Sequence, residues 1–141
     1  MSHADIPVIQ RNLEHLDTWL HDLQQLLACP DDTSAFKALR AVLHSIRDRL
    51  VADEAVDLGA QLPLIIRGAY YEEWKPTRTP EKIRDPEEFL ERIAEDFGQD
   101  CDPEALLRAV LDVLERRIDR GQVQQVLDML PDEIVQRARR A

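Results

Sequence analysis

The sequence predicts an all-α protein of about eight helices, and three observations lead to this prediction. Apolar residues recur at alternating steps of three and four, which is the period of an amphipathic helix. Several of these runs begin beside Asp or Pro, residues that favour a helix start. No window alternates apolar and polar residues in period two, so no strand is expected.

The first half of the chain contains four runs of this kind. The first carries six apolar residues in register: Ile9, Leu13, Leu16, Leu20, Leu23 and Leu27. Residues 30–34 then supply a proline and candidate N-caps, and the same spacing returns over 36–50. Asp53 is a candidate N-cap for a third helix that ends near Leu62. Pro63 fits the first turn of a fourth helix, because proline is tolerated there.

The second half repeats this plan. Asp85-Pro86 and Asp102-Pro103 are each followed by glutamate, a combination that favours a helix start. Apolar stripes follow these two starts over 89–97 and 107–118. A seventh run and a short eighth helix meet at Leu130-Pro131. Each half therefore reads as four helices.

The two halves also resemble each other in sequence at a constant offset of 68 positions. Residues 39–69 align with 107–137, and 9 of the 31 pairs are identical, including both Leu-Pro pairs. We therefore predict an internal duplication, in which a four-helix unit spans 6–73 and recurs at 85–140. The two units should be related by a pseudo-twofold axis and pack as one bundle-like domain over 1–141.

Composition excludes several classes of function. The chain has 28 acidic and 18 basic residues and a net charge of −10, which works against general binding to nucleic acid or to an anionic membrane. No apolar run is long enough to span a membrane, and the N-terminus lacks the layout of a signal peptide, so we expect a cytoplasmic protein. Cys29 and Cys101 form no disulfide framework and no zinc or redox motif, and we expect both to be reduced thiols.

No signature of an enzyme, a metal site or a cofactor is present. The four glycines are isolated, so no glycine-rich loop can hold a phosphate. No two histidines share a helical face, and Glu-x-x-His is absent. We therefore expect a non-enzymatic protein without a metal or cofactor.

Residues 61–74, with the sequence QLPLIIRGAYYEEW, are the most distinctive part of the chain. They are joined by Lys82-Ile83-Arg84 ahead of Glu88-Phe89-Leu90, and by residues 107–111 ahead of the second Leu-Pro pair. Together these motifs resemble a bacterial and archaeal family catalogued as domain of unknown function 2267, over roughly 8–135. The resemblance implies a fold and a segment of interest but no reaction, because the family has no established activity.

Three of the seven aromatic residues, Tyr70, Tyr71 and Trp74, lie within five positions. With Arg67 they should share one face of the helix that Pro63 opens. One interpretation is structural: the rings pack across the seam between the two halves. The other is functional, because Tyr, Trp and Arg are enriched at binding hot spots.

A Pro-containing basic linker at 74–84 joins the two units, and its prolines and threonines should prevent a helix. Together with Arg67, its cations Lys75, Arg78 and Arg84 suit an anion, because guanidinium groups bind carboxylates and phosphates. Alternatively, these cations only neutralise nearby glutamates.

The sequence therefore predicts a cytoplasmic interaction or scaffolding module that binds a protein partner or a second copy of itself. The predicted binding residues are Arg67, Tyr70, Tyr71, Trp74, Lys75, Arg78 and Arg84. The alternative is a sensor-like domain that holds a small anionic ligand between the two halves, with Arg67, Arg78 and Arg84 as its cations.

Overall fold

The computed structural model describes residues 2–28, 31–82 and 85–139, and within these ranges it contains eight α-helices and no strand. The prediction of an all-α fold is confirmed. The helices are α1 (Pro7–Leu26), α2 (Asp32–Arg49), α3 (Ala52–Gln61), α4 (Leu64–Tyr71), α5 (Pro86–Phe97), α6 (Pro103–Arg117), α7 (Arg120–Met129) and α8 (Asp132–Arg139). Two single turns of 3-10 helix, η1 (His3–Asp5) and η2 (Pro76–Arg78), complete the described structure. None of the described helices is long and apolar enough to cross a membrane.

Helix starts follow the sequence signals in most cases. The side chains of Asp31, Asp85, Asp102 and Asp119 each accept a backbone N–H of the helix that follows. The sequence suggested Asp53 as the N-cap of α3, but Asp53 does not cap this helix. It lies in the first turn, after the N-cap Val51, where a negative charge is favoured by the helix dipole.

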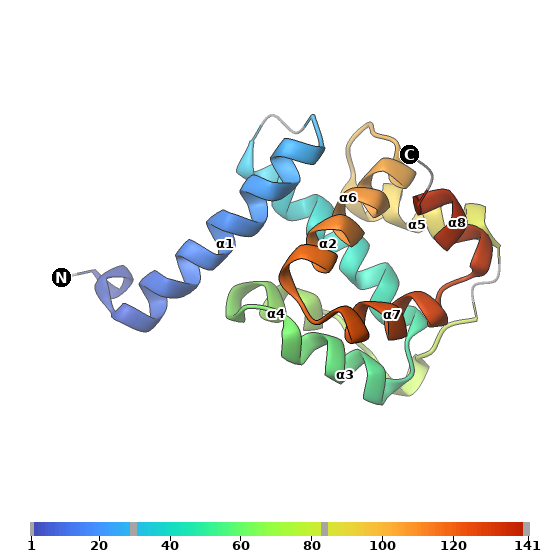
Figure 1. Cartoon of the computed structure of the whole chain (residues 1–141), viewed down its shortest axis with the longest axis horizontal. Coiled ribbons are helices and arrows are strands. Elements are labelled where there is room, and N and C mark those ends of the chain that lie inside the picture. Colours follow the sequence, from blue (N-terminus) through green and yellow to red (C-terminus); the bar gives the residue numbers. More distant parts are fainter. Residues whose placement is uncertain (1, 29–30, 83–84, 140–141) are drawn as a thin grey trace.

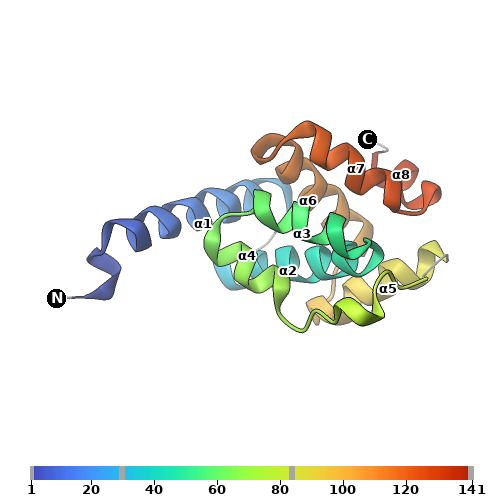
Figure 2. The same ribbon diagram turned by 90° about the horizontal axis from the view of Figure 1, so that it is seen from below.

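Helix α2 lies at the centre of the molecule, between α1, α4, α5 and α6 (Figures 1 and 2). Every residue from Ala41 to Asp48 is buried, so this helix has no solvent-exposed face over two turns. The side chains of Leu39, Leu43 and Ile46 on this helix are at most 1% exposed. The single hydrophobic core of the protein is built around them.

The contacts between the two halves are few in kind. Helix α2 packs against α5 and α6, α1 packs against α6, and α3 packs against α7. A pseudo-twofold axis that exchanges α1–α4 with α5–α8 would pair these same helices. The symmetry of the duplication itself stays a prediction.

The two Leu-Pro junctions have nearly the same backbone. Leu62 ends α3 with φ −87° and ψ 145°, and Leu130 ends α7 with φ −85° and ψ 154°. In both, the leucine N–H donates to the carbonyl three residues earlier, at 3.1 Å and 3.2 Å. The proline that follows cannot donate a hydrogen bond, so a new helix begins there in a new direction.

The first part of α1 projects from the body of the protein (Figures 1 and 2). We call residues 6–16 the outer segment. Among them only Asn12 and Leu16 are half-buried, and the others are exposed. From Trp19 onwards the same helix enters the core, where Leu20 and Leu23 are buried.

Candidate functional site

Tyr70 belongs to the core and not to the surface. Its side chain is 0% exposed, and its hydroxyl donates to the carbonyl oxygen of Ala55 at 2.7 Å. Burial raises the pKa of the Tyr70 hydroxyl, because the phenolate would lose its hydration. The residue therefore joins α4 to α3 and offers nothing to a partner.

Tyr71 and Trp74 continue this aromatic packing outward. The Tyr71 ring lies 4.9 Å from the ring of Tyr70 and 5.5 Å from that of Trp74. Trp74 is not on α4, which ends at Tyr71, but in the turn that follows. Both side chains are partly buried against the core. Helix α4 packs mainly on α1, α2 and α3, so the aromatic residues are packed within the first half rather than across the seam.

Arg67 has a structural role at the end of α3. Its Nε donates to the carbonyl oxygen of Gly59 at 2.9 Å, and its Nη2 donates to that of Leu62 at 2.8 Å. The Gly59 carbonyl also accepts the Leu62 N–H, so Arg67 adds further donors to the carbonyls at the end of α3. Arg67 also lines a different pocket from Lys75 and Arg78, so the predicted cluster of cations is divided. Arg84 lies outside the described residues.

Lys75 and Arg78 line a pocket of about 420 Å³ between α2, the linker and α5. The linker here is not wholly irregular, because Pro76 starts the single turn η2. Neither cation forms an ion pair within the described part of the chain. The acids Glu73 and Asp96 line the same pocket, which is therefore not strongly basic.

A network of charges forms the inner wall of this pocket. Asp48 accepts hydrogen bonds from Arg47 at 2.9 Å and from Arg92 at 3.0 Å. Arg92 also pairs with Glu81, and the Glu81 N–H donates to the Asp48 carbonyl at 2.7 Å. Burial acts to lower the pKa of Arg92, but the two carboxylates outweigh it and raise this pKa. The network ties the linker and α5 to α2.

Arg47 is the most buried charge of this network, with 3% of its side chain exposed. Its Nη1 donates to the carbonyl oxygens of Tyr70 at 2.6 Å and Glu72 at 2.8 Å. Arg47 thus binds the end of α4 as well as Asp48. No sequence motif marks Arg47 and Asp48, although two adjacent charged residues between the apolar positions Ile46 and Leu50 were a signal for them.

His44 lies beside this network and is also buried. Its Nε2 is 2.7 Å from the carbonyl oxygen of Ala69, and the neutral ring donates there. Burial lowers the pKa of His44, and the charges of Arg47 and Arg40 lower it further, against the opposing effects of the Ala69 carbonyl and Asp48. The folded protein therefore favours the neutral imidazole.

The outer segment of α1 exposes its apolar residues. Ile6, Val8, Ile9 and Leu13 are 45%, 50%, 37% and 39% exposed. Leu16, at the end of the segment, is packed against the core. The sequence predicted the apolar stripe of this helix, but not that half of it lies in solvent. A stripe of this kind fits a surface that a partner covers.

Comparison with known proteins gives a family but no activity. The model of a family described as "Uncharacterized conserved protein (DUF2267)" matches residues 16–136. No match to a curated protein was found. The family match begins at Leu16, where the outer segment of α1 ends, so residues 6–15 lie outside it. Among the described residues, no group of three potential ligands could hold a metal ion.

The contact between Tyr71 and Gly59 generates the first prediction. A Cβ atom on Gly59 would lie 2.2 Å from the Tyr71 hydroxyl oxygen and 2.6 Å from its Cζ. Gly59→Ala should therefore lower the free energy of unfolding by about 1–3 kcal/mol, the usual cost of overpacking. Urea denaturation followed by circular dichroism measures this change.

Gly68→Ala is the matched control, because no atom lies within 4 Å of a Cβ at Gly68 on α4. Alanine is the better helix former, so this change should raise the free energy of unfolding by about 0.5–1 kcal/mol. Equal effects of the two substitutions would show that Tyr71 does not rest on Gly59.

His44 generates the second prediction. Its pKa is lowered in the folded state, so protons bind the unfolded chain more tightly. The free energy of unfolding should fall as the pH is lowered through about 6.5, the ordinary pKa of histidine, towards the lower pKa of the folded state. His44→Gln keeps a donor for the Ala69 carbonyl and should remove this part of the pH dependence.

Urea denaturation between pH 7.5 and pH 5 tests this expectation. His15→Gln, at an exposed position on α1, serves as the control and should leave the pH dependence of the parent protein intact. A His44→Gln variant whose free energy of unfolding changes with pH as that of the parent does would show that His44 is not the source of this pH dependence.

Proposed function

Because the chain belongs to this family of uncharacterized proteins, which supplies no activity, we propose from its geometry that it is a non-enzymatic interaction module. Its contact element is the outer segment of α1. The observation that carries this proposal is the exposure of Val8, Ile9 and Leu13 on a helix that projects from the body, together with Ile6 at its N-cap. We also propose a cytoplasmic setting in a bacterium, which the acidic composition and the family resemblance support.

The spacing of the stripe suits pairing with another helix. Ile6, Ile9, Leu13 and Leu16 follow each other at steps of three, four and three. This is the a and d pattern of a coiled-coil seam, and Leu20 and Leu23 continue it into the core. The inner part of the stripe is thus covered by the protein itself, and the outer part requires a partner.

A second copy of this chain is the partner that the charges favour. The whole chain has a net charge of −10, so two copies repel each other through most of their surfaces. The outer segment is the exception, because it carries only Arg11 and Glu14 and is neutral. Two copies can therefore meet through it without bringing their acidic surfaces together.

The third prediction concerns this pairing. Replacing both Ile9 and Leu13 by Gln should leave the free energy of unfolding within about 0.5 kcal/mol, because both side chains are already exposed. The same double substitution should abolish self-association, measured by sedimentation equilibrium. Association of the parent protein should strengthen as salt rises, because salt screens the repulsion between acidic copies.

Arg11→Gln with Glu14→Gln is the control for this experiment. It changes the polar face of the same helix segment and keeps its net charge at zero. This variant should associate as the parent does. A parent protein that stays monomeric at high concentration and high salt would refute the second copy as partner, and loss of association in the control would refute the apolar stripe as contact.

Binding of a small anion is a second candidate function. Anion binding is supported by two cations, Lys75 and Arg78. Both line one pocket between the two halves and form no ion pair within the described ranges. Arg47 and Arg92 form the wall of this pocket, but their donors already bind Asp48, Glu81 and backbone carbonyls. Lys75 and Arg78 are therefore the residues left to bind a ligand.

The fourth prediction tests this pocket with inorganic phosphate as the probe. Phosphate should shift the amide resonances of Lys75, Thr77, Arg78 and Thr79 in a saturable manner. Lys75→Gln with Arg78→Gln should weaken its binding at least tenfold. Arg11→Gln, at an exposed position of α1 that does not line this pocket, should leave binding unchanged. Equal binding by the parent and the double variant would exclude this site.

A further inference from the structure

The direction in which two outer segments pair depends on where the rest of each copy lies. The outer segment is neutral, and nearly all of the net charge of −10 is carried by the body of the protein, at the C-terminal end of this segment (Figures 1 and 2). Parallel segments would place the two acidic bodies side by side. Antiparallel segments place the bodies at opposite ends, separated by about 16 Å, which is about twice the Debye length at physiological salt. The charges therefore favour the antiparallel pair.

The apolar stripe has a symmetric register for such a pair. When a positions face d positions of an antiparallel helix, Ile6 meets Leu16 of the second copy, and Ile9 meets Leu13 of the second copy. Both pairs are centred on residue 11. Arg11 is two residues from Ile9 and from Leu13, so it lies on the opposite face of the helix. The two copies of Arg11 therefore do not meet at the centre of the contact.

A pocket of about 440 Å³, which we call the base pocket, lies at the inner end of the outer segment. Its lining includes His15 and Trp19 of α1, Leu62 and Pro63 at the junction of α3 and α4, Arg67 of α4 and Arg117 of α6. Among the described residues that line the base pocket, none is acidic. In a chain of such acidic composition, this is a place where a carboxylate from another copy meets cations.

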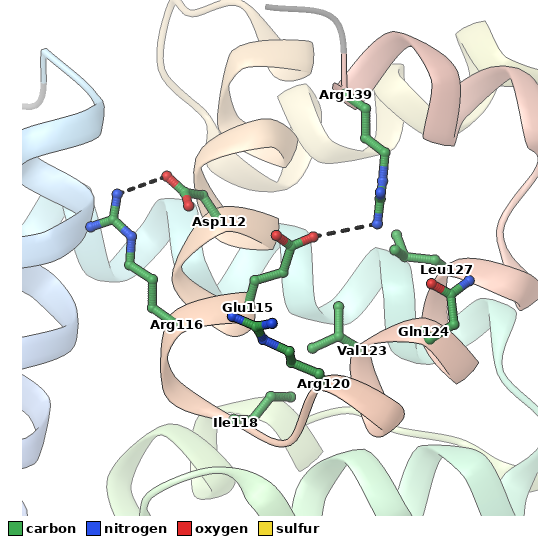
Figure 3. Close-up of a pocket in the computed structure, with 9 residues that line it drawn as sticks. All are labelled: Asp112, Glu115, Arg116, Ile118, Arg120, Val123, Gln124, Leu127 and Arg139. Atoms are coloured by element: carbon green, nitrogen blue, oxygen red, sulfur yellow. Dashed lines mark hydrogen bonds and ion pairs between the residues drawn. The ribbon is translucent and has the colours of Figure 1, made fainter.

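The pocket of about 790 Å³ between α6, α7 and α8 differs from the base pocket in this respect. Its lining includes arginines together with their own carboxylates, since Arg116 binds Asp112 at 3.0 Å and Arg139 binds Glu115 at 3.4 Å (Figure 3). These cations are already neutralised by acids of the same pocket.

The two arginines of the base pocket keep donors for a further group. Arg67 donates through Nε and Nη2 to backbone carbonyls, and Arg117 donates through Nε to Asp22 at 2.8 Å. Within the described part of the chain, Nη1 of Arg67 and both Nη atoms of Arg117 form no hydrogen bond. Each of these atoms can donate to a carboxylate.

An antiparallel pair brings the N-terminal turn of the second copy to the base pocket. Because Ile6 of the second copy lies against Leu16, the turn η1 that precedes this Ile6 lies beside His15 at the edge of the pocket. The turn η1 ends at Asp5, whose side chain is exposed. In a parallel pair, the same turn would lie at the outer end of the partner's α1, away from the pocket.

We propose that the second copy lies antiparallel to the first and places its Asp5 in the base pocket, against Arg67 and Arg117. The inference rests on the proposed function, because it requires that the outer segments pair. The carboxylate of Asp5 accepts hydrogen bonds from the remaining guanidinium donors, an interaction that is stronger than one between neutral groups. A twofold pair makes this contact twice, once at each end of the seam. Each base pocket is thus completed by a residue of the other copy.

Disulfide cross-linking of the full chain tests the direction of the pair. Cys29 and Cys101 are first replaced by serine, so that only introduced cysteines react, and sedimentation equilibrium checks that this parent still associates. Ile6→Cys alone should give no covalent dimer on mild oxidation. Its two copies lie about 15 Å apart in an antiparallel pair, whereas a disulfide requires about 4.4–6.8 Å between Cα atoms. An equal mixture of Ile6→Cys and Leu16→Cys chains should give a covalent dimer.

A second mixture covers the case in which Leu16→Cys lowers the stability, because Leu16 is packed against the core. Ile9 and Leu13 are both exposed, and a mixture of Ile9→Cys and Leu13→Cys chains should give more covalent dimer than either variant alone. The denaturation midpoint of each variant shows whether its fold is intact.

Asp5→Lys tests the contact in the base pocket. This substitution lowers the net negative charge, so it would strengthen association if only the repulsion between acidic copies mattered. In the proposed pair it places an ammonium group against Arg67 and Arg117, and it should weaken association at least tenfold in sedimentation equilibrium. Glu95→Lys makes the same change of charge at an exposed position of α5 and should not weaken association.

The outcomes separate this inference from the proposed function. A parent protein that does not associate overturns both. A parent protein that associates, while Ile6→Cys alone gives a covalent dimer, overturns the antiparallel direction and leaves the pairing of outer segments intact. An Asp5→Lys variant that is folded and associates as strongly as the parent overturns the contact in the base pocket.

Discussion

A helix that is buried on every side needs partners for the charged side chains and the imidazole it carries, and α2 imposes this constraint on the rest of the protein. His44, Arg47 and Asp48 all lie in its buried stretch. A buried charge without a partner is very costly, so the surrounding elements are placed where they satisfy these groups. The end of α4 supplies carbonyls, α5 supplies Arg92, and the linker supplies Glu81. The positions of three elements thus follow from the polar residues of one helix.

This arrangement explains why the basic linker is not a free tether between the two halves. Its Glu81 is bound to Asp48 through the backbone and to Arg92 through the side chain. The linker is thereby fixed against α2 and α5, the two helices with the most extensive contact between the halves. Its cations Lys75 and Arg78 are held at the edge of one pocket instead of moving freely in solvent.

Local signals in the sequence were sufficient for the helices but not for the candidate site. A Leu-Pro pair or an Asp-Pro pair sets the backbone conformation at its own position. Pro63, Asp85 and Asp102 therefore marked helix boundaries correctly. Whether each of two neighbouring aromatic residues is buried or exposed depends instead on which helix packs against its side chain. Tyr70 is therefore buried while Tyr71 is only partly so, and Arg67 binds backbone carbonyls that no motif indicates.

The continuity of α1 has a consequence for the helical state of its outer segment. An isolated peptide of this length is a poor helix, because the first turn fixes several residues for a single hydrogen bond. Here the buried turns around Leu20 and Leu23 already supply that nucleus, and the outer segment only propagates it. The apolar stripe is therefore presented on a formed helix, and a partner that covers it does not bear the entropic cost of nucleation.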